Sequence, residues 1–130
     1  MTKPGPGRMA GRVGLALSIL VTLFLAADAG AKLAQLPQVL EATAQLGFPP
    51  GSVRGIGALL LAAVLLYAWP RTAVWGALLL TAYLGAAVAA HVRIGSPWLS
   101  HVFFPVYIAL MAWAGLVLRR PDLAALLRVR

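Results

Sequence analysis

Long apolar runs separated by short polar segments dominate the pattern along the chain. Four of them approach the length of a membrane span, at residues 13–31, 53–69, 72–90 and 102–118. A span needs about 20 apolar residues, or somewhat fewer when flanking side chains reach the interface. Because lipid offers the backbone no hydrogen-bond partners, such runs predict helices. The pattern therefore predicts an all-α membrane protein, an antiparallel bundle of four transmembrane helices over residues 13–118.

Two of the connections between runs have patterns of their own. Residues 69–72 read Trp-Pro-Arg-Thr, in which Pro70 stops one helix and Thr72 can cap the next, so we expect a tight hairpin. In the first outer loop, Pro37 suits the first turn of a helix, and apolar residues then recur near helical spacing. This loop is predicted to carry a short amphipathic helix over residues 37–46.

The basic residues flank the apolar runs and indicate how the chain is threaded. The chain has 11 Lys and Arg against 3 Asp and Glu, with a net charge of +8. Eight of the basic residues lie before the first run, in the 69–72 turn or after the fourth run, and only Lys32, Arg54 and Arg93 lie on the other side. The positive-inside rule then places both termini, residues 1–12 and 119–130, in the cytoplasm.

Composition supports the membrane assignment and excludes several kinds of function. Apolar residues make up 62% of the 130 residues, which leaves too little polar surface to coat a soluble globule. The basic residues are not gathered on one face with aromatic readers, so we expect no nucleic-acid partner. The absence of cysteine excludes disulfide relays, thiolate catalysis and iron–sulfur clusters on this chain.

The first run has a second interpretation. A basic segment, an apolar stretch from Val13 to Ala27 and the small residues at 29–31 also resemble a cleavable signal peptide. Cleavage would leave three spans. We prefer an uncleaved first helix, because four spans can close into a bundle.

Polar and charged side chains gather at the ends of the runs on the predicted outer side. Asp28 and Lys32 stand four residues apart, so they can form an ion pair on one helix face. A charged group in hydrocarbon costs about 2.5–3.5 kcal/mol, so this clustering predicts a shared polar pocket. The candidate ligand-binding cluster comprises Asp28, Lys32, Glu41, Arg54, His91, Arg93 and His101. The alternative is that these residues mark helix ends, with long side chains reaching water.

The two histidines raise the question of a metal or haem site. With Asp28 or Glu41, His91 and His101 would form a set of two histidines and one carboxylate, and two facing histidines can bind haem. No local spacing supports either site, so we predict no metal ligand and no cofactor from the residues. The sequence also assembles no nucleophile with a base and an oxyanion hole, and no phosphate loop. This favours a protein without its own catalysis.

Small residues recur at every fourth position of the third run, which predicts a packing seam. Such a row lets a neighbouring helix approach closely, although an alanine-rich chain can also produce it by chance. The row comprises Ala73, Ala77, Thr81, Gly85 and Ala89. In the fourth run, Pro105 is expected to bend the helix and widen its outer end.

Several segments together resemble the DoxX-like family of small four-helix bacterial membrane proteins. They are Lys32 after the first run, LGFPP at 46–50, WPRTAVWGALLLTAYLGAAVAAHVRIG at 69–95, SHVFFPV at 100–106 and LRRPDLAALL at 118–127. The similarity extends over about residues 13–127. One departure is Ser96, where an acidic or amide residue is common in the family.

The resemblance implies a four-helix bundle in the bacterial cytoplasmic membrane. The family takes its name from a subunit associated with thiosulfate and quinol oxidation, and relatives are linked to oxidative-stress complexes. A quinone is therefore a ligand that the resemblance implies. The positions that match recurring family positions, without assigned roles, are Lys32, Gly47, Pro49, His91, Arg93 and His101.

Three functions are compatible with these observations. The first is a non-catalytic accessory component of a redox- or quinone-linked complex, packed beside its subunits in the bilayer. The second is a binder or transporter of a small lipophilic or anionic molecule, held by Lys32, Arg54 and Arg93. The third is a membrane chaperone or assembly factor that uses the seam of small residues. Association into a homo-oligomer is open in all three.

Overall fold

The computed structural model describes residues 5–128 as a set of helices. Its four membrane-length segments are α1 (Pro6–Leu33), the 3-10 turn η1 (Pro50–Ser52) with α3 (Val53–Ala68), α4 (Ala73–Arg93), and the π-helical turn η2 (Trp98–Val102) with α5 (Phe104–Arg119). Two short helices complete the chain, α2 (Pro37–Gln45) and α6 (Pro121–Leu127). Lys3 and Arg130 lie outside the described residues. The prediction of an all-helical bundle with four spans is confirmed.

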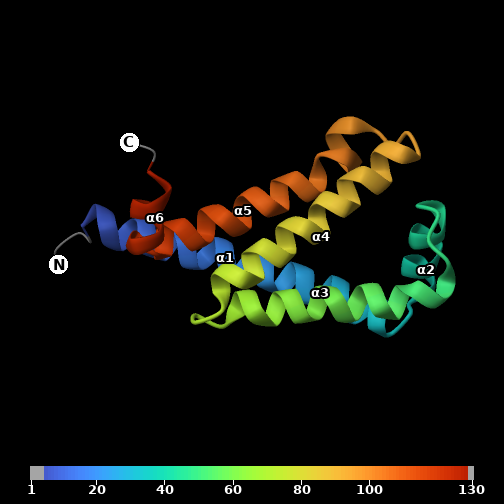
Figure 1. The fold of residues 1–130 in the computed structure, drawn as a ribbon, viewed down its shortest axis with the longest axis horizontal. Coiled ribbons are helices and arrows are strands. Elements are labelled where there is room, and N and C mark those ends of the chain that lie inside the picture. The colour runs from blue at the N-terminus through green and yellow to red at the C-terminus, as the bar shows by residue number, and fades with distance from the viewer. Residues whose placement is uncertain (1–4, 129–130) are drawn as a thin grey trace.

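The four long helices form a ring in which each packs against two neighbours (Figure 1). α1 packs against α3 and α5, and α4 packs against the same two helices. One end of the bundle carries the 69–72 turn, α6 and the start of α1, and we call it the termini end. The opposite end carries α2, η1 and η2, and we call it the loop end. Large apolar side chains such as Leu23, Leu65 and Leu110 point outwards and are more than half exposed, as a lipid-facing surface requires.

Glycines set the closest helix contacts. A Cβ at Gly115 of α5 would lie 2.6 Å from the Ser18 hydroxyl and 3.0 Å from the Gly14 carbonyl oxygen of α1. A Cβ at Gly57 of α3 would lie 2.7 Å from the Cβ of Lys32. At Gly76 of α4 it would overlap the backbone of α3. At each of these positions glycine has no side chain, so two helix backbones can approach closely, as expected for helices that associate in lipid.

The predicted seam of small residues on α4 covers only part of its length. Ala73 and Ala77 are buried against the bundle, but Thr81, Gly85 and Ala89 are exposed. A Cβ at Gly85 would meet no atom of the described chain within 4 Å. The prediction is therefore wrong for Gly85 and Ala89, whereas the exposed Thr81 still contacts α5, because its hydroxyl accepts from the Trp113 indole. A strict four-residue repeat drifts around a helix of 3.6 residues per turn, so its later members leave the packed face.

Left-handed residues end three helices at the loop end, Gln35 (φ +52°) after α1 and a glycine after each of α2 and α4. Gly47 (φ +89°) follows α2, and the next amide, of Phe48, donates to the Thr43 carbonyl at 3.2 Å. Gly95 (φ +71°) follows α4, and the Ser96 amide donates to the His91 carbonyl at 3.0 Å. These are Schellman caps, in which glycine removes the strain of positive φ. They fix the position of both loops that surround the loop end.

Thr72 and Pro105 have structural roles that differ from those predicted. Thr72 does not cap α4 through its side chain, because its hydroxyl donates back to the Leu66 carbonyl at 2.8 Å and so closes the end of α3. Pro105 lies in the first turn of α5, where no amide is needed, so it starts this helix and does not bend it.

Side-chain hydrogen bonds link the long helices, and those of Tyr67 are buried. The Tyr67 hydroxyl of α3 donates to the Ala112 carbonyl of α5 at 2.7 Å and lies 2.9 Å from the Ser18 hydroxyl of α1. Since the one proton of Tyr67 is used on Ala112, Ser18 is the donor in the second bond. On α5, the Trp113 indole donates to the Thr81 hydroxyl of α4 at 2.7 Å. All four long helices are thus joined by polar contacts in their apolar surroundings.

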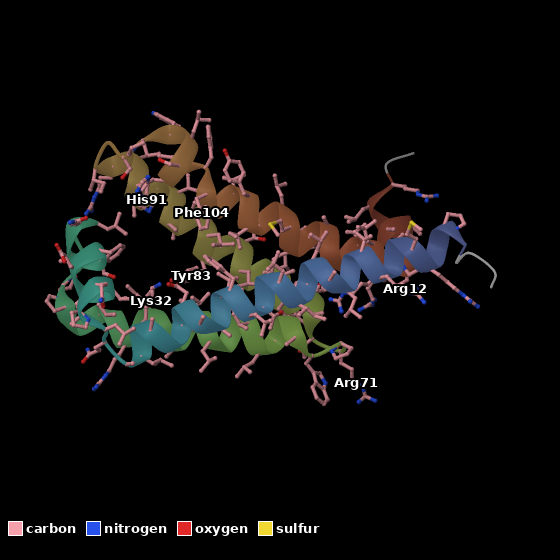
Figure 2. The ribbon with its side chains drawn as sticks, turned by 180° about the vertical axis from the view of Figure 1, so that it is seen from behind. Arg12, Lys32, Arg71, Tyr83, His91 and Phe104 are labelled. Carbon is pink, nitrogen blue, oxygen red and sulfur yellow. The ribbon has the colours of Figure 1, made fainter. Side chains whose placement is uncertain are left out.

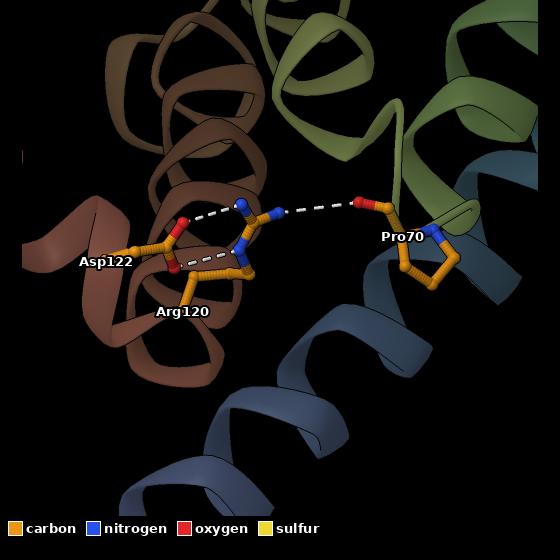
Figure 3. A network of polar contacts seen from close by, with 3 residues as sticks. All are labelled: Pro70, Arg120 and Asp122. Atoms are coloured by element: carbon orange, nitrogen blue, oxygen red, sulfur yellow. Dashed lines mark hydrogen bonds and ion pairs between the residues drawn. The ribbon is translucent and has the colours of Figure 1, made fainter.

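An arginine ties the C-terminal segment to the hairpin turn at the termini end (Figure 3). Arg120 donates to both carboxylate oxygens of Asp122, at 3.1 and 2.8 Å, and to the Pro70 carbonyl at 3.4 Å. The side-chain hydrogen bonds from Arg120 lower the pKa of Asp122 to about 2. The C-terminal segment forms the short helix α6, whose first turn contains this aspartate.

Candidate ligand-binding cavity

α3 and α4 separate towards the loop end and leave a cavity between them. Gly76, Tyr83 and Ala90 lie seven residues apart and therefore share one face of α4. Gly76 abuts Tyr67 of α3, whereas Tyr83 and Ala90 line a cavity of about 650 Å³. The two helices are in contact near the hairpin and diverge from it (Figure 1). We call this space the loop-end cavity.

The loop-end cavity is mostly apolar, with a small polar part. Side chains of α1, α2, α3, α4 and α5 all contribute to its wall. Its polar lining residues are Asp28, Lys32, Gln38, Thr43, Tyr83 and His91. Figure 2 shows Lys32, Tyr83 and His91 directed into the same region from α1 and α4. An apolar cavity of this size with a few convergent polar groups is typical of a small-molecule site.

The predicted ion pair between Asp28 and Lys32 is present in the cavity wall. The Lys32 ammonium contacts the Asp28 carboxylate across one helical turn of α1. The Lys32 side chain is 14% exposed and that of Asp28 is 37% exposed. α1 is held here by the contact of Gly57 with Lys32, which fixes where the pair faces. Because the two charges compensate each other, the pair is polar but has no net charge.

Tyr83 and His91 add hydrogen-bonding groups from α4. The Tyr83 hydroxyl faces the cavity opposite Lys32 (Figure 2). His91 also lines the cavity, and its Nδ1 is 3.0 Å from the Ser96 hydroxyl in the loop that follows α4. This hydroxyl holds one ring nitrogen of His91, so the ring has a defined orientation with Nε2 as its remaining polar atom. The cavity can thus present several donors and acceptors to a compact polar group.

The other four residues of the predicted cluster do not line the cavity. Glu41 and Arg54 are exposed at the loop end. Arg93 is exposed too and donates to the Leu46 carbonyl at 2.9 Å. His101 stacks edge-on with His91, with 5.7 Å between ring centroids. The structure therefore brings Asp28, Lys32 and His91 together, and it leaves Glu41 and Arg54 apart from them.

α2 covers the cavity at the loop end. Thr43 is its one buried residue, and the face that lines the cavity also includes Gln38, Val39 and Leu46. The bond from Arg93 to the Leu46 carbonyl fastens the end of α2 to the end of α4 across the cavity. Glu41, Ala44 and Gln45 are exposed on the face of α2 that does not line the cavity.

The alanines that form the α4 wall were not predicted from the sequence. Ala82, Ala86 and Ala90 line the cavity, one position along from the predicted row of small residues. These alanines form a second row with a four-residue spacing in the same run, but periodicity alone does not say which face of a helix packs against another helix. Phe24 and Phe104 were missed as well, because their contact joins residues eighty positions apart in the sequence.

The histidine pair lacks the further ligands that a metal site needs. Within residues 5–128, no group of three or more His, Asp and Glu side chains lies close enough together to hold a metal ion. The Nδ1 atom of His101 is 2.7 Å from the Ser100 hydroxyl. Each histidine is thus engaged by a serine of its own loop, and the arrangement favours hydrogen bonding over metal binding.

Comparison with known proteins identifies the family of the chain. Residues 16–115 match the DoxX-like family, a region that contains all four spans in large part and every polar residue of the cavity. No curated protein and no solved structure matches the chain. The match covers most of the sequence, so the chain belongs to the DoxX-like family and is an integral membrane protein.

Proposed function

We propose that this protein binds a small lipophilic molecule with a compact, uncharged polar headgroup in the loop-end cavity. The observation that carries the proposal is the cavity itself, about 650 Å³ of mostly apolar space into which Asp28, Lys32, Tyr83 and His91 project. Apolar walls would bury the body of the ligand, and the polar groups would orient its head. A quinone fits this description and is the ligand class that the family resemblance implies.

The charges of the site favour a neutral headgroup over an anion. Lys32 is already paired with Asp28, and Arg54 and Arg93 do not line the cavity. An anion would therefore have to compete with the Asp28 carboxylate for the ammonium group. A carbonyl or hydroxyl can instead accept from Lys32 or donate to Asp28 without breaking the pair.

The test uses a variant in which the ion pair is replaced by apolar residues. In Asp28→Leu/Lys32→Met no charge is left unpaired, so we expect the bundle to remain as stable as the wild type or to become more stable. A benzoquinone with a ten-carbon tail is added to the detergent-purified protein, and the free energy of unfolding is measured. Bound ligand at 100 times its Kd adds about 2.7 kcal/mol.

We expect saturable stabilisation of the wild type and of the control Arg54→Met, but not of Asp28→Leu/Lys32→Met. Arg54 is a matched control, because it is a cation at the same end of the bundle that does not line the cavity. Equal stabilisation of all three proteins would contradict a role for the pair in holding the headgroup. No stabilisation of the wild type would contradict the proposal for this ligand class.

We also propose that the protein lies in the bacterial cytoplasmic membrane with both termini in the cytoplasm. The support is the distribution of basic residues, since Arg8, Arg12, Arg71, Arg119 and Arg120 all lie at the termini end. The loop-end cavity would then lie in the outer half of the bilayer.

The absence of native cysteine makes this orientation simple to test. In intact cells, Ala44→Cys on the exposed face of α2 should react with a membrane-impermeant maleimide, and Gly7→Cys should react only after lysis. Both positions are exposed. The reverse labelling pattern would invert the proposed topology.

An accessory role in a redox-linked membrane complex remains a prediction. It rests on the family resemblance. Binding of a quinone in the stabilisation experiment would be consistent with it, because a non-catalytic subunit of a quinone-linked complex can bind quinone without reacting with it. The presence of redox subunits in the material purified in mild detergent would support this role.

A further inference from the structure

We propose that the ligand enters the loop-end cavity sideways from the bilayer, through an opening between α3 and α4, and that its tail stays in this opening when it is bound. This inference rests on the proposed function and specifies it further. The ligand class is then a membrane-dissolved molecule with one polar head and one flexible apolar tail. We call the opening the α3–α4 window.

Exposed side chains from both helices line the cavity at the window. Leu59 of α3 is 59% exposed and Leu79 of α4 is 42% exposed, yet both belong to the cavity wall. Ala82 and Ala86 of α4 also line the cavity and are exposed. A residue that lines a cavity and is exposed on the outer surface marks where the two meet. The small alanine side chains leave this opening unobstructed.

The window faces lipid and not water. Its residues are apolar, and they belong to the middle of two helices that are long enough to span a bilayer. From Leu79 to His91 the chain advances twelve residues, or about 18 Å along the axis of α4. The opening is therefore well inside the hydrocarbon region when the loop end lies at the interface.

α2 and an aromatic pair bound the cavity in the remaining directions. α2 covers the loop end, where Arg93 fastens it through the Leu46 carbonyl. On the α1–α5 side, Phe24 and Phe104 meet edge to face with 5.8 Å between ring centroids. Both rings of this pair are themselves exposed, Phe24 at 46% and Phe104 at 44%, so this side is filled by aromatic side chains and is not sealed. Figure 2 shows Phe104 on this side of the bundle, with Tyr83 between it and Lys32. The bulky aromatic pair on one side contrasts with the alanines on the other.

The cavity wall is polar near α2 and apolar at the α3–α4 window, which matches a ligand with its head at the loop end and its tail in the window. The polar residues Lys32, Gln38 and Thr43 are near α2, and the window residues lie deeper in the bundle. A head at the loop end with a tail that runs towards the bilayer centre would therefore meet matching surfaces along its length. The tail would leave through the window into lipid, so the cavity volume does not limit its length.

The test compares two probes with the same benzoquinone head on the protein in lipid vesicles. One probe has no tail, and the other has a ten-carbon tail with a diazirine at its end, which crosslinks on illumination. In the wild type we expect crosslinks of the tailed probe on α3 and α4, at positions such as Leu59, Leu79 and Ala82.

A matched pair of variants tests whether the window sets the fit of the tail. Ala86→Trp places an indole in the window, and Gly85→Trp places it one residue away, where a Cβ would meet no described atom within 4 Å. We expect Ala86→Trp to weaken binding of the tailed probe about tenfold, which corresponds to about 1.4 kcal/mol. Binding of the tail-less probe to Ala86→Trp, and of both probes to Gly85→Trp, should match the wild type.

The outcomes separate the two proposals. If neither probe binds the wild type saturably, the proposed function fails for this head and the window proposal fails with it. If the probes bind but crosslinks fall on α2, or at Phe24 and Phe104, the window is overturned while the binding function stands. The window is also overturned if Ala86→Trp and Gly85→Trp have equal effects on the tailed probe.

Discussion

Tyr67 shows how single polar side chains hold this bundle together. Its hydroxyl is buried and connects α1, through Ser18, with the Ala112 carbonyl of α5. In a membrane there is no hydrophobic force between helices that could replace such a contact, so packing and hydrogen bonds have to supply the association. Removal of this hydroxyl leaves one donor and one acceptor without their partner.

We therefore expect Tyr67→Phe to lower the free energy of unfolding by about 1 kcal/mol. The matched control is Tyr107→Phe, because Tyr107 is exposed and its hydroxyl makes only a long contact of 3.4 Å with the Leu99 carbonyl. Unfolding in a titration with a denaturing detergent, followed by circular dichroism, measures both variants. Equal stability of Tyr67→Phe and Tyr107→Phe would show that the buried bonds contribute nothing.

Asp122 provides a second prediction at the residue scale, one that depends on pH. Hydrogen bonds from Arg120 lower its pKa from the ordinary 3.8 to about 2. A lowered pKa in the folded state means that the stabilising contribution of this pair is complete above about pH 4 and is lost as the pH falls through 2. Carboxyl NMR should show a midpoint near 2 in the wild type and a higher one in Arg120→Met. A wild-type midpoint near 3.8 would contradict the contact.

At the scale of the helices, the contact between α1 and α5 depends on the absence of side chains. Gly14 and Gly115 let the two backbones approach, and a Cβ on Gly115 would lie within 3.0 Å of both the Ser18 hydroxyl and the Gly14 carbonyl. A larger side chain there would force the helices apart and would disturb the Ser18–Tyr67 bond as well. Gly85 is the useful comparison, since it lies on an exposed face of α4.

We expect Gly115→Val to destabilise the bundle by about 1–3 kcal/mol through overpacking. Gly85→Val should be neutral, because the added methyl groups extend into lipid. The free energies of unfolding of the two variants decide the question. If Gly85→Val is the more damaging variant, the packed face of α4 has been assigned to the wrong residues.

The helices were predictable from sequence, but which faces meet was not. The lengths of the apolar runs predicted four spans, and Pro37 with the apolar spacing after it predicted the short α2 that the structure contains. The row on α4 was assigned to packing as far as Ala89, yet Gly85 and Ala89 are exposed, and the buried residues beyond Ala77 are Leu80, Leu84 and Ala90. A periodic pattern describes one helix, whereas the contact depends on the angle between two.

The candidate site was predictable to the same extent. Asp28 and Lys32 were paired correctly, because residues four apart on a helix are neighbours whatever surrounds them. Arg54 and Glu41 were grouped with them incorrectly, because residues at the same depth in the membrane do not necessarily lie on facing surfaces. The cavity itself arises from the divergence of α3 and α4, which no local pattern in the sequence contains.

At the scale of the whole molecule, the bundle is tight at the termini end and open at the loop end. Gly76 closes α3 on α4 near the hairpin, and Arg120 joins α6 to the same turn. At the loop end, α2 covers the space between the helices. The wall of this space is mostly apolar, and the Asp28–Lys32 ion pair lies on its α1 side. The termini end thus holds the helices together, and under the proposed function the open end holds the ligand.

The most direct test of this account is native mass spectrometry of the protein released from its own membranes in mild detergent. We expect the wild type and Arg54→Met to carry one molecule of a neutral, single-tailed lipophile, identified by its fragmentation, and Asp28→Leu/Lys32→Met to have lost it. A bundle that carries only common phospholipids, in the same amount in all three proteins, would contradict a specific binding site in the loop-end cavity.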